Sequence, residues 1–392
     1  MSGKKTIVQR LATLRERLES GMDRREFLRT AVNAGYAVGM AQLLGVDDFL
    51  AVDDGTVPIV TALVRSDPDD PRSIEERTTT VPAEWYATVS KAFELHDSIA
   101  QASITGYLGS AVVPGDHRSG EATISVNVSV EDLGRTRAVL ERILGDVAYN
   151  VESIEEVEEL DEDRERIDPT FISDVGDVDD YRVPGGVGCQ AEIGMATLTP
   201  ALYHPQNDQT FFATARHAYG KSGDVRGGEL ALPFEDGTQV DLGRVRHDHP
   251  VEDIVAVEPT GEYLPDSAVE GSVSERVRGQ FTRFGLADLA ARGEPLQKVS
   301  ALTGHTTGDI EGIDAITCLT GDVCRRGQLR WGNEEDMADG DSGSVSYHPD
   351  PDAPEEGVLV AGLNNARTWW PGQSYIWGTA AYQLTEQYGY HF

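Results

Sequence analysis

The chain is poor in lysine. Five of its 33 basic residues are lysines, and 67 acidic residues give a net charge of −34. Because phosphate is bound by basic patches and the sequence has none, we expect no nucleic-acid partner. An acidic, lysine-poor composition is typical of proteins that stay soluble in concentrated salt, where repulsion between charges is screened within a few Å. We therefore predict a salt-adapted protein, and an ordinary acidic protein is the alternative.

Cysteine and long apolar runs are also scarce. Three cysteines, Cys189, Cys318 and Cys324, are too few for a disulfide framework. Cys318 and Cys324 are close enough in sequence to close one small loop in an exported protein. No stretch reaches the roughly 18 charge-free apolar residues of a membrane-spanning helix. We expect no stable membrane insertion and no cofactor, and the sequence leaves the oligomeric state open.

Paired arginines near the N-terminus precede a mildly apolar stretch. Arg24 and Arg25 are followed by Phe27-Leu28 and then by residues 30–46, which carry no charge and are rich in Gly and Ala. Residues 1–50 therefore resemble a twin-arginine export signal. This predicts an extracellular or cell-surface protein, and the alternative is an amphipathic helix.

The next hundred residues, 57–158, are predicted to form a small α+β unit. Apolar positions recur at helical spacing in residues 83–100 and in a second segment that opens at residues 130–133. Four strand-like runs surround these two segments: 57–64, 103–113, 121–130 and 147–154. The order βαββαβ is that of a ferredoxin-like fold. Because this unit precedes a region of different texture, we interpret it as a pro-region or an interaction domain. Acid-rich residues 159–182 are predicted to be a solvated linker.

Residues 183–392 consist of short β-rich runs separated by Gly, Pro and Asp turns, which predicts an all-β sandwich or barrel. The segment Gly340-Asp341-Ser342-Gly343 stands out within it. A serine hydroxyl is a weak nucleophile until a neighbouring base takes its proton. The flanking glycines permit a tight turn and leave the amides of Gly340 and Ser342 available as an oxyanion hole. Taken alone, the four residues are equally consistent with a plain β-turn.

Two further residues complete a candidate catalytic set. His217 follows the apolar, strand-like run 211–213, and Asp253 precedes another such run, 254–257. A carboxylate at a strand end is able to accept a hydrogen bond from an imidazole and fix its tautomer. Each residue taken singly is as well explained by a structural role. The chain order His, Asp, Ser is that of the chymotrypsin class and differs from those of subtilisins and α/β-hydrolases.

These segments resemble the motifs of chymotrypsin-like serine peptidases: Thr-Ala-x-His at 214–217, Asp-Ile-x-x-Val at 253–257 and Gly-Asp-Ser-Gly at 340–343. Residues 299–312 resemble a further segment of bacterial members. The resemblance covers residues 183–392. It implies an all-β double six-stranded barrel with the triad in the cleft, in an exported, haloarchaeal-type member. In this family the residue six before the nucleophile lies at the base of the specificity pocket. Here that residue is Asp336, which would favour Arg or Lys.

The sequence departs from the family pattern in three places. Ser344 stands where Gly is usual, Arg216 adjoins His217 where a small residue is common, and the cysteine pair that flanks the histidine is missing. Asp248 is a rival for Asp253, which we prefer because an apolar run follows it directly. His247 and His249 would suggest a metal site, but no third ligand is in view, so we predict none.

The sequence therefore predicts a serine endopeptidase acting on proteins or peptides. Ser342 is expected to be the nucleophile, His217 the general base and Asp253 the residue that orients the base. The alternatives are a non-catalytic protease-like binding protein and an esterase with the same triad.

Overall fold

The computed structural model describes residues 55–102, 104–129, 132–145, 147–154, 181–204, 209–220, 223–270, 275–318, 324–370 and 373–392. The predicted export signal, residues 1–50, and nearly all of the predicted linker, residues 159–182, lie outside the described residues. No helix among the described residues combines the length and the apolar character needed to cross a membrane.

The smaller of two β-sheets has seven strands in the order β8-β7-β11-β12-β13-β10-β9. They are β7 (Gly188–Gln190), β8 (Met195–Thr197), β9 (Leu202–His204), β10 (Gln209–Ala215), β11 (Glu229–Pro233), β12 (Gln239–His249) and β13 (Ile254–Pro259). The sheet curls on itself, because the Thr199 amide donates to the Ala213 carbonyl at 2.9 Å and Thr214 Oγ1 donates to the Thr197 carbonyl at 2.7 Å. The inward-facing Val, Leu and Phe side chains of these strands fill its interior.

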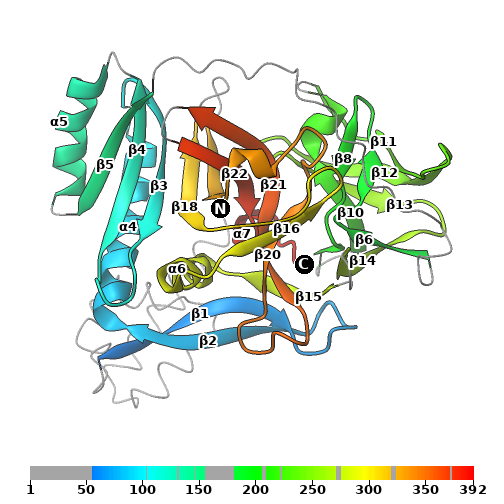
Figure 1. The fold of residues 1–392 in the computed structure, drawn as a ribbon, viewed down its shortest axis with the longest axis horizontal. Helices are drawn as coiled ribbons and strands as arrows, with labels where there is room; N and C mark the ends of the chain where they lie inside the picture. Colours follow the sequence, from blue (N-terminus) through cyan, green and yellow to red (C-terminus); the bar gives the residue numbers. More distant parts are fainter. Residues whose placement is uncertain are drawn as a thin grey trace, which may run out of the picture.

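The larger sheet has fifteen strands, which are all the other strands that the structure describes. Its C-terminal strands are β14 (Leu264–Val269), β15 (Glu275–Phe281), β16 (Leu296–Ser300), β17 (Gly304–Gly308), β18 (Ile310–Thr317), β19 (Arg325–Trp331), β20 (Val345–Pro349), β21 (Val358–Trp370) and β22 (Gln373–Ala380). The short strand β6 (Arg182–Gly185) pairs with β14. Two helices, α6 (Arg283–Arg292) and α7 (Ala381–Tyr388), pack on these strands, and Thr282 caps α6 by accepting a hydrogen bond from the Gly285 amide. Figure 1 shows the smaller sheet (green) beside the yellow-to-red strands.

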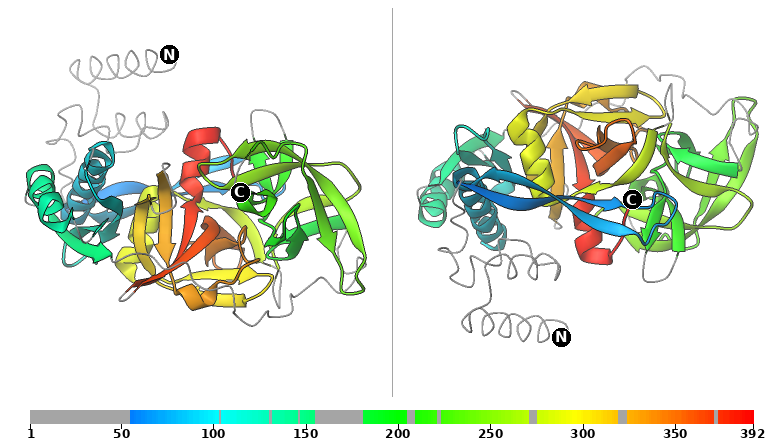
Figure 2. Two further views of the ribbon diagram at one scale, coloured as in Figure 1. Left: turned by 90° about the horizontal axis from the view of Figure 1, so that it is seen from above. Right: turned by 90° about the horizontal axis from the view of Figure 1, so that it is seen from below.

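The N-terminal segment forms β1 (Thr56–Arg65), β2 (Ile74–Pro82), α4 (Ala83–Gln101), β3 (Tyr107–Pro114), β4 (Ala122–Ser129), α5 (Leu133–Leu144) and β5 (Ala148–Ile154). The predicted ferredoxin-like fold is not what these elements form. The strand β2 is additional, and β1 pairs with β2 and β15, whereas β3, β4 and β5 continue the larger sheet from β18. The strands of the segment therefore join the larger sheet at two separate places. Figure 2 shows the β1–β2 hairpin (blue) running alongside the yellow and red strands.

One apolar core unites the N-terminal segment with the larger sheet. Trp85 and Val89 of α4 belong to the same buried cluster as Leu289 of α6, Ile313 of β18 and Leu329 of β19. Gly285 of α6 lies so close to β1 that an added Cβ would be 1.8 Å from the Thr61 carbonyl oxygen. Burial of apolar surface is the main stabilising term in folding, so the core holds residues 56–154 against the strands that follow.

The β-rich character predicted for residues 183–392 is confirmed. The smaller sheet has seven strands rather than six. The pairing of Cys318 with Cys324 that the spacing allowed is present as a disulfide, and Cys189 is free and buried.

Candidate active site

His217 lies where β10 passes into a short 3-10 helix, Arg216–Tyr219. The preceding strand residues Phe211, Phe212 and Ala213 are fully buried and fix the backbone, whereas the His217 side chain is 39% exposed. The ring is therefore anchored at one end and open to solvent at the other. Its Nδ1 is 2.8 Å from Asp253 Oδ2, and its backbone amide donates to Asp253 Oδ1 at 2.9 Å.

Asp253 is buried and precedes β13. Its backbone has a φ of 57°, in the left-handed region that few residues other than glycine adopt. Its carbonyl oxygen accepts a hydrogen bond from the Arg216 amide at 3.0 Å. Because an ionised carboxylate only accepts hydrogen bonds, the contact requires the Nδ1–H tautomer of His217, which leaves Nε2 free to accept a proton.

The rival carboxylate, Asp248, has a different partner. Its Oδ1 accepts a hydrogen bond from Arg216 Nε at 2.7 Å, and the Arg216 guanidinium also donates to the carbonyl oxygens of Gly220 and Gly223. Arg216 is therefore directed to Asp248 rather than to the imidazole next to it in sequence. Asp253 is the carboxylate that contacts His217.

Ser342 lies in the turn before β20, and this turn packs against β10. The Ser342 carbonyl accepts a hydrogen bond from the Thr197 amide at 2.9 Å, and the Gly343 amide donates to the Asn364 carbonyl at 2.8 Å. Gly343 has a φ of 99°, and a Cβ added there would lie 2.1 Å from the Thr197 carbonyl oxygen and 3.0 Å from the Ala215 nitrogen. The glycine thus allows the serine turn to approach the strand end that carries His217. No hydrogen bond joins the Ser342 hydroxyl to the His217 ring among the described residues.

A buried carboxylate holds the serine turn in shape. Asp341 is fully buried, and it accepts hydrogen bonds from the amides of Leu302, Thr303 and Ala338 and from the Thr303 hydroxyl. The ammonium group of Lys298, which is also fully buried, is 3.9 Å from Asp341 Oδ2. Burial lowers the pKa of Lys298 to about 8, while Asp341 and Asp336 act in the opposite direction.

The amides predicted to form an oxyanion hole are available. Neither the Gly340 nor the Ser342 amide donates a hydrogen bond to another group in the described part of the chain. Gly340 has a φ of 116°, and a Cβ there would lie 2.8 Å from Leu302 Cδ1, so only glycine fits the turn. Two unpaired donors on one tight turn are what a developing oxyanion requires.

Asp336 lies in the short 3-10 helix Glu334–Asp336 that precedes the serine turn. Its carbonyl accepts a hydrogen bond from Thr303 Oγ1 at 3.0 Å, and its charge acts on Lys298. Nearby, Arg367 donates to the Met337 carbonyl at 2.7 Å and is 3.6 Å from Asp339. The acid at the expected base of the pocket therefore has cations in its surroundings, and its role in specificity stays a prediction.

In the described part of the chain, no third candidate ligand joins His247 and His249. His249 Nε2 is 3.1 Å from the Tyr390 hydroxyl, and burial lowers the pKa of His249 to about 4. Within the described ranges no group of three or more His, Cys, Asp or Glu side chains is arranged to hold a metal ion.

Sequence reasoning missed three cations around this site: Lys298, Arg367 and Arg325. The Arg325 guanidinium is 3.3 Å from Asp253 Oδ2. Each of these side chains meets its acidic partner through the tertiary fold, and no local pattern marks such a contact.

Several solved structures resemble about half of this chain. A glutamic acid specific serine protease that uses a histidine triad in substrate binding shares 15% identity at a TM-score of 0.40, over 53% of this chain and 99% of its own. Cellulomonas bogoriensis chymotrypsin shares 14% identity at a TM-score of 0.38, over 54% of this chain and 97% of its own. Thermobifida fusca protease A shares 16% identity at a TM-score of 0.39, over 53% of this chain and 97% of its own. No family model and no curated protein matches the chain. These likenesses are too distant to assign a function, which must come from the site itself.

Proposed function

We propose that the chain is a serine endopeptidase of the chymotrypsin type, with its active site between two β-barrels. The observation that carries the proposal is the double contact of Asp253 with the ring and the amide of His217, next to a serine turn packed on the same strand. A histidine held in one tautomer with its second nitrogen free is suited to act as a general base.

In the proposed mechanism Ser342 Oγ attacks the carbonyl carbon of a peptide bond while His217 Nε2 takes the hydroxyl proton. The amides of Gly340 and Ser342 stabilise the negative oxygen of the tetrahedral intermediate. His217 then returns the proton to the leaving amine, and an acyl-enzyme remains on Ser342. Water, activated by the same imidazole, releases the acid product. Asp253 stays ionised throughout and stabilises the imidazolium.

Labelling with a fluorophosphonate tests this proposal, because only an activated serine reacts with it. We expect the full-length protein in high salt to be labelled at Ser342, as located by mass spectrometry of its peptides. Ser342→Ala should abolish the labelling and reduce peptide hydrolysis on the order of 10⁶-fold. Peptide hydrolysis that persists in this variant would contradict the assignment.

A non-catalytic, protease-like binding protein is the second candidate. The lack of a hydrogen bond between Ser342 and His217 among the described residues favours it. Catalytic hydrogen bonds are often long before substrate binds, so this observation does not outweigh the paired Asp253 and His217. Absence of labelling in a folded protein would support the binding role.

A triad esterase would be labelled but would cleave simple esters in preference to a peptide library.

We also propose that Asp336 favours substrates with Arg or Lys before the cut. The support is its position six residues before Ser342. Because Lys298 and Arg367 lie nearby, the preference should be weak. Matched peptides with Arg or Glu before the cut measure it, and Asp336→Asn should reduce the ratio of their kcat/KM values.

We further propose that the protein is exported and salt-adapted. The Cys318–Cys324 disulfide supports export, because such bonds persist in oxidising compartments. If residues 57–158 are a pro-region, cleavage after them should not release them, because the strands β1 to β5 share a sheet and a core with elements later in the chain. We therefore favour a lasting assembly role for this segment.

A further inference from the structure

A guanidinium lies beside the carboxylate that holds His217. Arg325 Nη1 is 3.3 Å from Asp253 Oδ2, and the same oxygen is 2.8 Å from His217 Nδ1. The Asp253 side chain is 3% exposed and that of Arg325 is 28% exposed. A buried anion therefore has two positively polarised partners on one oxygen, the imidazole N–H and the guanidinium.

The other charged groups around Asp253 have partners of their own. Arg216 is paired with Asp248 at 2.7 Å. The Glu252 carboxylate accepts a hydrogen bond from the Tyr388 hydroxyl. Within the described part of the chain, Arg325 is the one Lys or Arg that forms an ion pair with Asp253.

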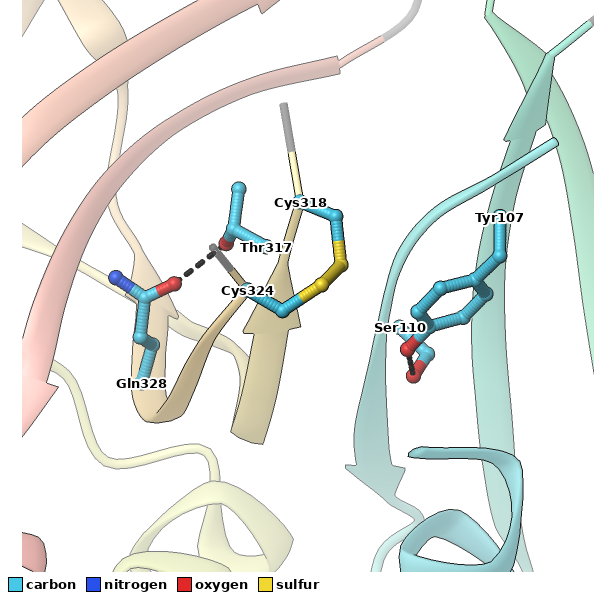
Figure 3. Close-up of a disulfide and its surroundings, with 6 residues drawn as sticks. All are labelled: Tyr107, Ser110, Thr317, Cys318, Cys324 and Gln328. Carbon is cyan, nitrogen blue, oxygen red and sulfur yellow. Dashed lines mark hydrogen bonds between the residues drawn. A yellow bond between two sulfur atoms is a disulfide. The ribbon is translucent and has the colours of Figure 1, made fainter. Parts of the chain in front are cut away.

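Two features place Arg325 at the first position of β19. On one side it stands opposite Thr317 of β18, and Thr317 in turn stands opposite Gly109 of β3. The Cys318 amide continues this pairing by donating to the Leu108 carbonyl at 2.8 Å. Next to it, the disulfide between Cys318 and Cys324 joins the ends of β18 and β19, facing Tyr107 and Ser110 of β3 (Figure 3).

We propose that Arg325 is a positioning residue that fixes the Asp253 carboxylate against His217, and that the Cys318–Cys324 disulfide holds Arg325 in place. Its effect on rate rests on the proposed peptidase function, whereas its hold on Asp253 does not. The negative charge of Asp253 favours the protonated form of the His217 imidazole. The positive charge of Arg325, at this distance, offsets part of that effect. Its removal should both loosen the carboxylate and favour the charged imidazole, which is unable to act as a base.

The test compares Arg325→Gln with Arg326→Gln, which removes the same charge from the next residue of the same strand, where the side chain is exposed. Two quantities are measured in the full-length protein. The first is the rate of fluorophosphonate labelling at Ser342 as a function of pH. The second is the low-field proton NMR resonance of the His217 Nδ1–H, assigned by its loss in Asp253→Asn.

We expect Arg325→Gln to slow labelling roughly two- to fivefold near neutral pH, within the range of a partly exposed ion pair. The acid limb of the labelling profile should move to higher pH, and the Nδ1–H resonance should broaden through exchange with water. Arg325→Lys should keep the limb in place, and Arg326→Gln should match the natural protein in both measurements. A loss of fold alone would lower the amount of reactive protein without moving the acid limb.

A double variant, Cys318→Ser with Cys324→Ser, tests the role of the disulfide without changing any charge. It should shift labelling and the NMR resonance in the same direction as Arg325→Gln, by a smaller amount. Unchanged profiles and an unchanged resonance in Arg325→Gln would overturn the proposal. If the natural protein is not labelled at all, the peptidase function fails, and the NMR comparison alone decides whether Arg325 holds Asp253.

Discussion

At the scale of single residues, Lys298 and Asp341 form an ion pair whose side chains are both fully buried. Taking two charges out of water is costly, and the loss is offset only when both groups keep good partners. Asp341 has its hydrogen bonds from Leu302, Thr303 and Ala338, and the Lys298 ammonium donates to the hydroxyls of Ser300 and Thr303. The pair therefore stabilises the turn that presents Ser342.

Lys298→Met should destabilise the fold, because it leaves the Asp341 charge buried without a cation. Removal of one partner of a buried pair costs about 3–5 kcal/mol. Denaturant unfolding measures this cost, and the rate of labelling at Ser342 should fall in the same variant. The double variant Lys298→Met with Asp341→Asn should recover part of the lost stability. A single variant as stable as the natural protein would show that the pair has no such role.

Short motifs found the candidate triad, because the chemistry needs particular residue types at strand ends. The structure brings His217 and Asp253 into contact and sets the Ser342 turn beside them, while their catalytic roles stay predictions. Lys298 and Arg325 escaped notice, because their acidic partners are distant in sequence. In a chain with so many acidic residues, the composition does not predict which carboxylate forms an ion pair with a given Lys or Arg.

At the scale of elements, local patterns predicted single strands and helices well and their pairing poorly. The predicted helix 83–100 is α4, Ala83–Gln101, and the predicted strand 57–64 is β1, Thr56–Arg65. The strand β2 was missed because its residues, IEERTTTVP, are mostly exposed and lack apolar alternation. Alternation reports which face of a strand is buried, but not which strand lies next to it. The ferredoxin-like expectation failed for that reason.

The paired strands β3 and β18 lie so close at Gly109 that a side chain there should destabilise the protein. A Cβ there would lie 2.4 Å from the Ile316 carbonyl oxygen, so Gly109→Ala should push the strands apart and cost about 1–3 kcal/mol. Gly134 of α5 is the matched control, because nothing lies within 4 Å of its added Cβ. Gly134→Ala should stabilise the protein by about 0.5–1 kcal/mol, since alanine favours a helix. Thermal unfolding gives the melting temperatures of both variants. If both melting temperatures shift by the same amount in the same direction, the close contact between Gly109 and Ile316 is contradicted.

At the scale of the whole molecule, a group of histidines ties the C-terminus to the smaller sheet. His249 of β12 contacts Tyr388 and Tyr390, and the backbone of His391 pairs with that of Tyr203 in β9. Burial lowers the pKa of His391 to about 4, and it likewise lowers the pKa of His247. Tyr388 also donates to Glu252, the neighbour of Asp253, so the C-terminal residues adjoin the segment that carries the candidate triad.

These histidines should make the fold sensitive to acid. Because their pKa values in the folded protein lie below the ordinary value of 6.5, the folded state binds fewer protons than the unfolded state at mildly acidic pH. Their contribution to stability is fully present above pH 6.5 and should be lost as the pH falls towards 4. Denaturant midpoints measured across this range should decrease, and His249→Phe should flatten the decrease. His305→Phe, at an exposed position, is the control that should leave the slope unchanged.

The sheet that continues from β18 into β3 also bears on how pieces of this chain should behave. A fragment starting after residue 182 would leave the β18 backbone without its neighbour and would uncover Phe281, Ile313 and Leu286. Unpaired strand edges recruit strands from other molecules. Such a fragment, produced alone, should precipitate or associate with further copies, and supplying residues 55–154 as a separate peptide should keep it dispersed.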